Sequence, residues 1–324
     1  DNDNDNDNDN DNDNDKNKDG NERKEEEQGS CLRPRPINNL KDLVENNHAF
    51  ALPKPWVHLG MPKTGTTSLE AFWKCGLGVK NVSHSVCKVT NQYLINDVFD
   101  GQGGGPKNGD ACPSNSIRPC KLCATCMEAA KKHNLPLLQS CGNYDAYAQM
   151  DDNIDTCHYP QLSSLQEIHR EAPNATFIYM FRNMDSWVQS IQKFRKGSFV
   201  RYMWKCSRKH RPPQEAIPFL NGTDPQELRD FFCDSVTQAR AFVDAHPSHT
   251  LIEMDLDDPE TGRVLSKLFD IDIGCWEAKN INTKLHNNNT NNITAAAASS
   301  ASTTNNDKNK DMDKDNDKDK DKDK

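Results

Sequence analysis

Residues 56–68, Trp-Val-His-Leu-Gly-Met-Pro-Lys-Thr-Gly-Thr-Thr-Ser, decide how this chain folds. The apolar run at 56–59 predicts a buried strand, and residues 68–75 (Ser-Leu-Glu-Ala-Phe-Trp-Lys-Cys) predict a helix. The Gly/Pro/Thr loop between them, at 60–66, completes a strand–loop–helix unit. Such a loop points backbone N–H groups and the helix N-terminus at an anion, usually a phosphate. Lys63 adds a positive charge there, and the threonine hydroxyls add hydrogen-bond donors.

Strand and helix patterns alternate through the rest of the central sequence. Residues 177–181 (Phe-Ile-Tyr-Met-Phe) are an apolar run typical of a buried parallel strand. Other strands are expected at 79–86, 136–140 and 251–256, and helices at 127–132, 162–172, 187–194, 224–245 and from 258 onward. The expected N-caps are Ser164 in a capping box with Glu167, Asp185 or Ser186, and Asp224. This order predicts an α/β fold, in three α/β/α layers around a mainly parallel sheet.

The two ends of the 324-residue chain differ in composition from its centre. Residues 1–30 open with an Asp-Asn repeat and carry 13 acidic and 4 basic side chains, whereas residues 284–324 carry eight of each. Both ends are expected to be disordered, because they hold almost no apolar surface to offset the entropy of ordering. The folded domain is therefore expected at 50–283, and the net charge of −9 belongs to the leading tail.

The loop departs from the Walker A pattern of nucleoside triphosphatases. Gly60 and Gly65 have the Walker spacing, but Thr66 stands where the pattern requires lysine. Residues 62–67, Pro-Lys-Thr-Gly-Thr-Thr, instead resemble the 5′-phosphosulfate loop of the sulfotransferase superfamily. The Ser68-Leu69 pair after it is closer to carbohydrate-type Golgi members than to cytosolic ones. The resemblance implies a P-loop NTPase-like fold and the donor 3′-phosphoadenosine 5′-phosphosulfate, with no metal required; a P-loop kinase or NTPase is the alternative.

The resemblance also implies which residues bind the donor. The 5′-phosphosulfate would lie against Pro62, Lys63, Thr64, Gly65, Thr66, Thr67 and Ser68, with Lys63 as the catalytic contact to the bridging oxygen. The family's 3′-phosphate site is an arginine at a strand end and a serine eight residues later, which Arg182 and Ser190 match. Two alternatives stay open, namely a salt bridge between Arg182 and Asp185, and Ser186 as the phosphate-binding hydroxyl.

An acceptor hydroxyl also needs a general base. The first candidate is His84, after the expected second strand, and the second is Asp145, after the strand expected at 136–140. Glu70 is the third candidate. The family uses histidine or glutamate, while an ordinary hydrogen-bonded histidine and a turn-capping aspartate are the structural alternatives.

Residues 193–211 carry eight basic and no acidic side chains, interleaved with Phe194, Phe199, Tyr202 and Trp204. We expect this segment to line the acceptor site and attract an anionic glycan, with the aromatic rings as a stacking surface. A solvated helix face, or a non-catalytic glycan-binding module, is the alternative. No nucleic-acid motif accompanies the segment, so no nucleic-acid partner is expected.

Twelve cysteines, four of them in an irregular insertion at 100–126, favour disulfides in an oxidising compartment over a zinc site, whose usual signature is two separated Cys-x-x-Cys pairs. Glycosylation sequons at Asn81, Asn174 and Asn221 fit a secretory or Golgi lumen. No stretch of about 18 apolar residues predicts a membrane anchor, and no signal peptide is visible.

Overall fold

The computed structural model of the chain describes residues 31–36, 52–99, 120–152, 158–197, 199–202 and 224–276. The strands are β1 (Trp56–His58), β2 (Val82–His84), β3 (Val86–Lys88), β4 (Cys120–Leu122), β5 (Ala146–Gln149), β6 (Thr176–Phe181) and β7 (Thr250–Asp255). The α-helices are α3 (Thr66–Leu77), α4 (Gln92–Phe99), α5 (Cys123–Lys132), α6 (Leu137–Ser140), α7 (Pro160–Ser163), α8 (Leu165–Glu171), α9 (Met184–Lys193), α11 (Pro225–Ala245) and α12 (Thr261–Phe269). Short 3-10 helices are η1 (Val79–Asn81), η2 (Phe194–Gly197) and η3 (Ile273–Cys275).

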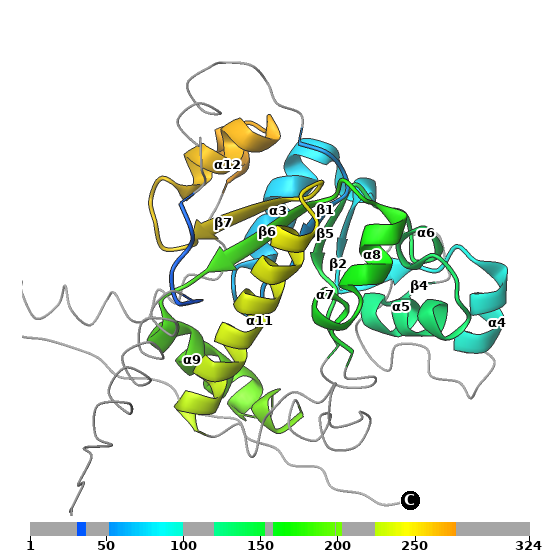
Figure 1. Cartoon of the computed structure of the whole chain (residues 1–324), viewed down its shortest axis with the longest axis horizontal. Coiled ribbons are helices and arrows are strands. Elements are labelled where there is room, and N and C mark those ends of the chain that lie inside the picture. Colours follow the sequence, from blue (N-terminus) through cyan, green and yellow to red (C-terminus); the bar gives the residue numbers. More distant parts are fainter. Residues whose placement is uncertain are drawn as a thin grey trace, which may run out of the picture. The chain divides into compact units, whose positions relative to one another are not determined.

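The strands form one sheet in the order β4-β3-β2-β5-β1-β6-β7. The five strands from β2 to β7 in this order are parallel, while β3 and β4 extend one edge as antiparallel neighbours. The carboxyl ends of the parallel strands therefore share one edge of the sheet, where ligands of open α/β sheets usually bind. The loop after β1, the last residue of β2 and the segment after β6 all lie at this edge (Figure 1).

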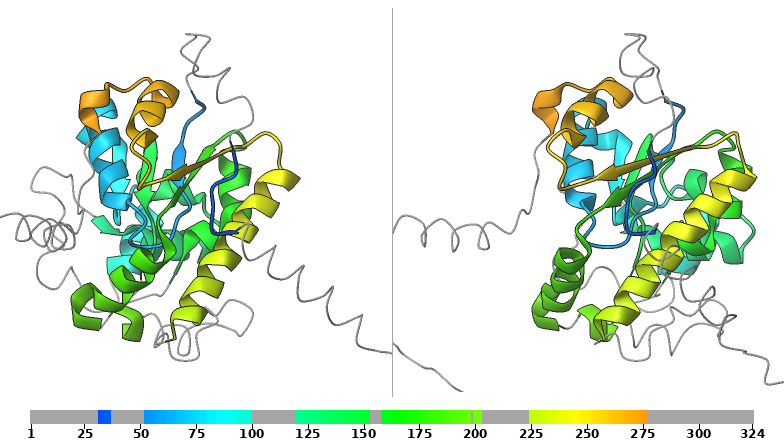
Figure 2. Two further views of the ribbon diagram at one scale, coloured as in Figure 1. Left: turned by 90° about the vertical axis from the view of Figure 1, so that its left-hand side faces the viewer. Right: turned by 60° about the vertical axis from the view of Figure 1, so that its left-hand side comes forward.

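Helices cover both faces of the sheet. Alternate residues of β1 divide between two hydrophobic clusters, since Val57 belongs to one and Trp56 to the other. The cluster with Trp56 contains the apolar faces of α3 and α12, and the cluster with Val57 contains those of α8, α9 and α11. Figure 2 shows α3 and α12 on one side of the sheet and α11 on the other. This arrangement confirms the predicted three-layer α/β class with a mainly parallel sheet.

Several local predictions were wrong. Residues 137–140 form the helix α6 rather than a strand, and the corresponding strand is β5, further along the chain. The N-cap of α9 is Asn183, whose side-chain oxygen accepts a hydrogen bond from the backbone N–H of Ser186 at 3.1 Å. Ser164 does stand at the N-cap of α8, but its side chain makes no capping bond. Asp224 caps α11 as predicted, accepting from Gln226 N.

The cysteines of the described ranges form disulfides. The described pairs are Cys31–Cys233, Cys75–Cys275, Cys87–Cys123 and Cys126–Cys141, and Cys120 is also disulfide-bonded. The part of the predicted insertion that is described is ordered as β4 and the start of α5, whereas 100–119 lies outside the described residues. No metal-binding group of histidine, cysteine and carboxylate side chains occurs in the described ranges. The disulfide prediction is therefore confirmed over zinc for these cysteines.

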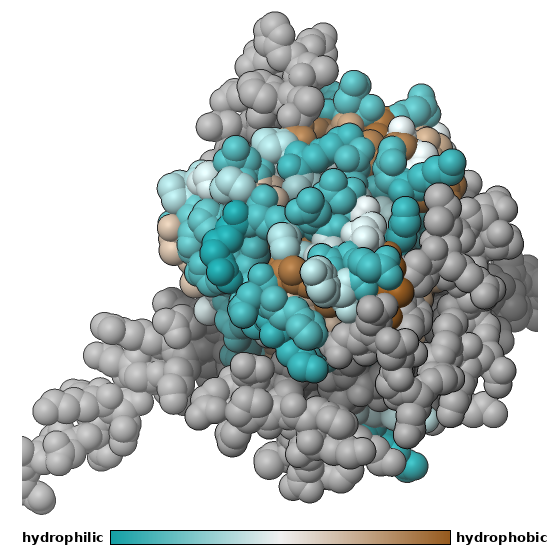
Figure 3. Space-filling model, turned by 90° about the vertical axis from the view of Figure 1, so that its right-hand side faces the viewer, coloured by the Kyte–Doolittle hydropathy of each residue, from teal (hydrophilic) through white to brown (hydrophobic). Residues whose placement is uncertain are grey.

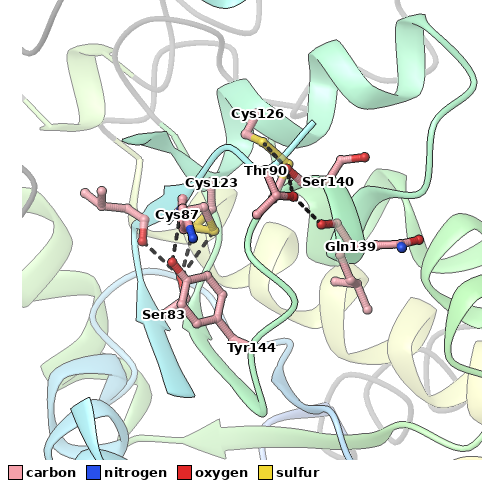
Figure 4. The surroundings of a disulfide bond; sticks show 12 residues. Ser83, Cys87, Thr90, Cys123, Cys126, Gln139, Ser140 and Tyr144 are labelled. Carbon is pink, nitrogen blue, oxygen red and sulfur yellow. Dashed lines mark hydrogen bonds between the residues drawn. A yellow bond between two sulfur atoms is a disulfide. The ribbon is translucent and has the colours of Figure 1, made fainter. Parts of the chain in front are cut away.

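The Cys87–Cys123 disulfide lies against the strand that carries His84. Ser83, the residue before it in β2, has its hydroxyl 2.9 Å from Cys123 Sγ and 3.3 Å from Cys87 Sγ. Figure 4 shows these groups, with Cys126 and Thr90 close by. The antiparallel edge of the sheet is thus cross-linked directly beside the carboxyl end of β2.

The segment 31–36, which precedes the predicted domain start at 50, also packs into the core. Cys31 is buried and bonded to Cys233 of α11. Arg240 of α11 and Glu253 of β7 form a buried ion pair, with bonds of 2.8 and 2.6 Å, and the backbone of the segment contacts both partners. Disulfide and ion pair together hold this segment against the domain.

The described surface exposes few large apolar side chains, namely Tyr93, Val79, Ile273 and Tyr202. The face in Figure 3 is mainly hydrophilic, with small hydrophobic areas among the polar side chains. No helix in the described ranges is both long and apolar enough to span a bilayer. Of the expected sequons, Asn81 and Asn174 are exposed.

Candidate active site

The course of the loop after β1 is set by two residues with left-handed backbone conformations. Lys63 and Gly65 adopt left-handed conformations, with φ of 71° and 94°. At Gly65 a Cβ atom would also come within 3.0 Å of Leu256, so glycine suits this position on both counts. Helix α3 begins at Thr66, and its first backbone bond runs from Leu69 N to Gly65 O. The earlier N–H groups therefore have no acceptor within the helix itself and point out of its amino end.

Two side chains pin the loop to the domain. The Thr64 hydroxyl is fully buried and donates to Met61 O at 2.6 Å, and the Thr64 N–H also points to this carbonyl at 3.3 Å. Trp187 of α9 donates its indole N–H to Pro62 O at 2.9 Å. Thr64 thus stabilises the loop internally, whereas Thr67 is half-buried at the helix end.

Two cations meet at the loop. Arg182 follows β6, and its Nη1 donates to Lys63 O at 3.4 Å. The Lys63 ammonium lies 4.2 Å above the Phe194 ring. Burial lowers the pKa of Lys63, and the charge of Arg182 lowers it further. The two groups predicted to bind opposite ends of one ligand are therefore neighbours at the same edge of the sheet.

No described acidic side chain forms a salt bridge with either cation. Asp185, the alternative partner of Arg182, instead pairs with Arg229 at 2.5 Å. The Arg182 Nε is buried and has no hydrogen-bond partner among the residues that the structure describes. Because a partly buried charge is costly without a counter-charge, this arrangement favours an anionic ligand.

A second group of side chains borders the loop on the other side. The Thr66 hydroxyl donates to Gln149 Oε1 at 3.2 Å and lies 3.4 Å from His84 Nε2. His84 Nδ1 lies 3.3 Å from Glu70 Oε2, and Glu70 also pairs with Lys74. Burial lowers the pKa of His84; Glu70 opposes this effect and Lys74 reinforces it. The first base candidate thus lies directly beside the start of α3.

Comparison with known proteins fits this geometry. The family model described as a sulfotransferase domain matches residues 57–250, more than half of the chain. The chain belongs to the sulfotransferase family. No curated protein matches the sequence of this sulfotransferase.

The structure does not bring Asp145 to the active site of the sulfotransferase. Asp145 precedes β5, and its carbonyl accepts from Trp56 N at the start of β1, so it lies at the amino ends of the parallel strands. Its carboxylate pairs with Lys54 at 2.8 Å. The prediction that Asp145 serves as the base was therefore wrong in its structural premise, because the strand expected before it is the helix α6.

The two serines considered as phosphate ligands, Ser190 and Ser186, differ in exposure. Ser190 is half-buried in α9, one turn after Ser186, which is exposed beside the N-cap. Both lie on the helix that follows Arg182, so either hydroxyl is available to the same region. Ser190 as a phosphate ligand stays a prediction.

The described aromatic rings of the basic segment do not form a continuous stacking surface. Phe199 is buried in the core and packs against Phe194, with ring centroids 5.3 Å apart. Arg201 and Tyr202 are exposed, while 203–211 lies outside the described residues. The prediction of a stacking role was therefore wrong for Phe199, which contributes to the core.

Three residues of the candidate site, namely Gln149, Trp187 and His58, were not predicted from the sequence. Gln149 joins Thr66 to Asp151, whose Oδ2 accepts at 3.2 Å, and Trp187 fixes the loop. His58, the last residue of β1, is buried beneath the loop, and a Cβ atom on Gly60 would come within 2.5 Å of its Nε2. Burial lowers the pKa of His58 to about 3, so the ring is neutral at pH 7. The one feature of the sequence that could have pointed to His58 was its position at the end of the strand that precedes the loop.

Proposed function

We propose that this sulfotransferase moves a sulfuryl group from 3′-phosphoadenosine 5′-phosphosulfate to an acceptor hydroxyl, on a carbohydrate. The observation that carries the proposal is the pair of adjacent cations, Lys63 and Arg182, for which no described carboxylate provides a counter-charge. A donor with anionic groups at both its 5′ and 3′ positions supplies the missing charge at two points.

Lys63 and the start of α3 would act on the 5′ side of the donor. The N–H groups at the beginning of the helix bind phosphate oxygens, and the helix dipole favours their negative charge. The Lys63 ammonium would contact the oxygen that joins sulfur to phosphorus, and would stabilise the charge that develops there as the S–O bond breaks. Its burial strengthens this effect, because less water screens the charge.

Arg182 would bind the 3′-phosphate, since a guanidinium can donate two parallel hydrogen bonds to one phosphate. The buried Nε of Arg182 is available for such a bond in the described structure. Ser190 would add a hydroxyl donor from α9. This remote contact would fix the reacting sulfur in place, and would select the donor over simple adenine nucleotides.

His84 would serve as the general base. Its Nε2 would take the proton of the acceptor hydroxyl while the acceptor oxygen forms the new O–S bond and the 5′-phosphate leaves. The lowered pKa of His84 keeps the imidazole neutral, as a base must be before the reaction. Because the transition state resembles that of phosphoryl transfer, alignment and charge stabilisation would provide most of the rate enhancement.

The acceptor class and compartment follow from other features. The exposed Arg201 and Tyr202 belong to the basic segment at 193–211, which suits an anionic carbohydrate. The disulfides and the exposed sequons support a secretory compartment such as the Golgi lumen.

A thermal-shift comparison tests the donor. Adenosine 3′,5′-bisphosphate should raise the Tm of the full chain more than ATP at equal concentration, because a ligand that binds only the native state stabilises it. Arg182→Ala should lose most of this shift, whereas Arg263→Ala, which removes an exposed arginine of α12, should retain it. A larger shift with ATP would favour a P-loop kinase or NTPase.

A transfer assay tests the reaction itself. Radiolabelled donor should label a carbohydrate in a panel of sulfated and unsulfated glycans, and Lys63→Ala should abolish the labelling. Binding of a glycan with no labelling of any panel member would instead support a non-catalytic glycan-binding module.

A further inference from the structure

The carboxylate of Glu70 lies between a lysine and the proposed base. One oxygen, Oε1, pairs with Lys74 one turn later in α3, and the other, Oε2, lies 3.3 Å from His84 Nδ1. All three side chains are largely shielded from solvent, with exposed fractions of 19 % for Glu70, 22 % for His84 and 27 % for Lys74. Since residues four apart in a helix share a face, Thr66, Glu70 and Lys74 form one row along α3.

The position of Glu70 determines where His84 carries its proton. An ionised carboxylate only accepts hydrogen bonds, so the nitrogen that faces Glu70 must be the protonated one. A neutral imidazole holds one proton, and His84 Nε2 is then left with its lone pair, 3.4 Å from the Thr66 hydroxyl. Free histidine prefers the opposite tautomer, with the proton on Nε2, so the Nδ1–H form has to be imposed by its surroundings.

We propose that Glu70 is a positioning residue that holds His84 in its Nδ1–H tautomer and so directs the basic Nε2 toward the start of α3. This inference rests on the proposed function for the meaning of the base, but the tautomer itself is a property of the protein alone. In this arrangement Glu70 orients the proposed base, with Oε2 facing His84 Nδ1 and Oε1 facing Lys74.

Lys74 limits how far the charge of Glu70 raises the pKa of His84. A lone carboxylate beside an imidazole favours the imidazolium, which cannot accept a proton. Here the charge of Lys74 opposes that effect, and burial opposes it more strongly. The groups that face His84 are Glu70 and Lys74 from α3, His58 from β1, and the uncharged Thr66. With His58 neutral, Glu70 and Lys74 are the charged groups among the described residues that influence the protonation of His84.

The test is NMR spectroscopy of the full chain labelled with ¹⁵N-histidine. The spectrum of His84→Asn identifies the His84 signals by their loss, and two-bond couplings then report which nitrogen carries the proton. In the unmodified protein at neutral pH, the structure requires the Nδ1–H form. A spectrum dominated by the Nε2–H form would overturn the proposal.

Glu70→Gln provides the sharpest variant, because it keeps the shape of the side chain. Its amide oxygen should turn to Lys74, which can only donate, and its NH₂ group should then donate to His84 Nδ1. The predicted result is inversion to the Nε2–H tautomer, with sulfuryl transfer reduced in the same variant. An unchanged tautomer in Glu70→Gln would refute the positioning role.

Lys74→Met is the matched control, since it removes the neighbouring charge and leaves Glu70 in place. His84 should keep its Nδ1–H form, and its pKa should rise. Inversion of the tautomer in Lys74→Met would overturn the assignment of the effect to Glu70. The thermal shift by adenosine 3′,5′-bisphosphate should persist in Glu70→Gln. If the unmodified protein showed no such shift, the proposed function would fail, while the tautomer measurement would still decide the role of Glu70.

Discussion

Acid should destabilise this sulfotransferase in part through His58, which is buried beneath the loop after β1. His58 is 1 % exposed, and burial sets its pKa at about 3 in the folded state against 6.5 for the free group. The unfolded chain therefore binds a proton at this residue in a pH range where the folded chain does not. Stability is fully present above pH 6.5 and falls as the pH drops from 6.5 toward 3.

The magnitude follows from the two pKa values. Each pH unit in this window costs about 1.4 kcal/mol of unfolding free energy. Between pH 8 and pH 5 the expected loss from His58 alone is about 2 kcal/mol. His249, whose pKa burial also lowers, adds a loss of the same sign.

Urea unfolding at pH 8 and pH 5, with the disulfides intact, measures this loss. His58→Asn should show a pH-dependent loss smaller by about 2 kcal/mol than the unmodified protein, whatever its absolute stability. His133→Asn, which changes an exposed histidine after α5, should retain the full loss. If His58→Asn were as acid-sensitive as the unmodified protein, the buried neutral state of His58 would be refuted.

Two further substitutions test contacts that hold the site. Trp187→Phe removes the indole donor to Pro62 O and leaves that carbonyl without its partner. Urea unfolding should therefore show a loss of about 1–3 kcal/mol in unfolding free energy, and the bisphosphate should bind more weakly in calorimetry. Unchanged values would show that α9 does not fix the loop. Arg240→Ala leaves the buried Glu253 without its counter-charge, although the Arg35 N–H still donates to it, and should destabilise the fold by about 3–5 kcal/mol in the same assay. A loss under 1 kcal/mol would contradict a desolvated ion pair.

The proximity of Arg182 to the loop after β1 was predictable because the sequence signals for both are local. The loop lies in one continuous stretch, and Arg182 stands at the end of an unambiguous apolar strand. The sheet order then brings the two together, since β6 is the direct neighbour of β1.

The surroundings of the two base candidates, His84 and Asp145, depended on information that is not local. The four residues of α6, Leu-Leu-Gln-Ser, are too few for periodicity to distinguish helix from strand, and this error misplaced Asp145. The contacts of His84 with Thr66 and Glu70 depend on the pairing of β2 with β5, and on the packing of α3 over both strands. Neither is visible in the spacing of residues along the chain.

The central claim is that Lys63 binds the 5′ side of the donor and Arg182 binds its 3′-phosphate. Calorimetric titration with two nucleotides tests this claim most directly. Adenosine 3′,5′-bisphosphate and adenosine 5′-phosphate differ only in the phosphate assigned to Arg182. We predict that Arg182→Ala weakens the binding of the bisphosphate by about 1.5–3 kcal/mol, roughly 10- to 100-fold in Kd, and leaves the monophosphate unchanged. Equal losses for both nucleotides, or no loss for either, would contradict the account.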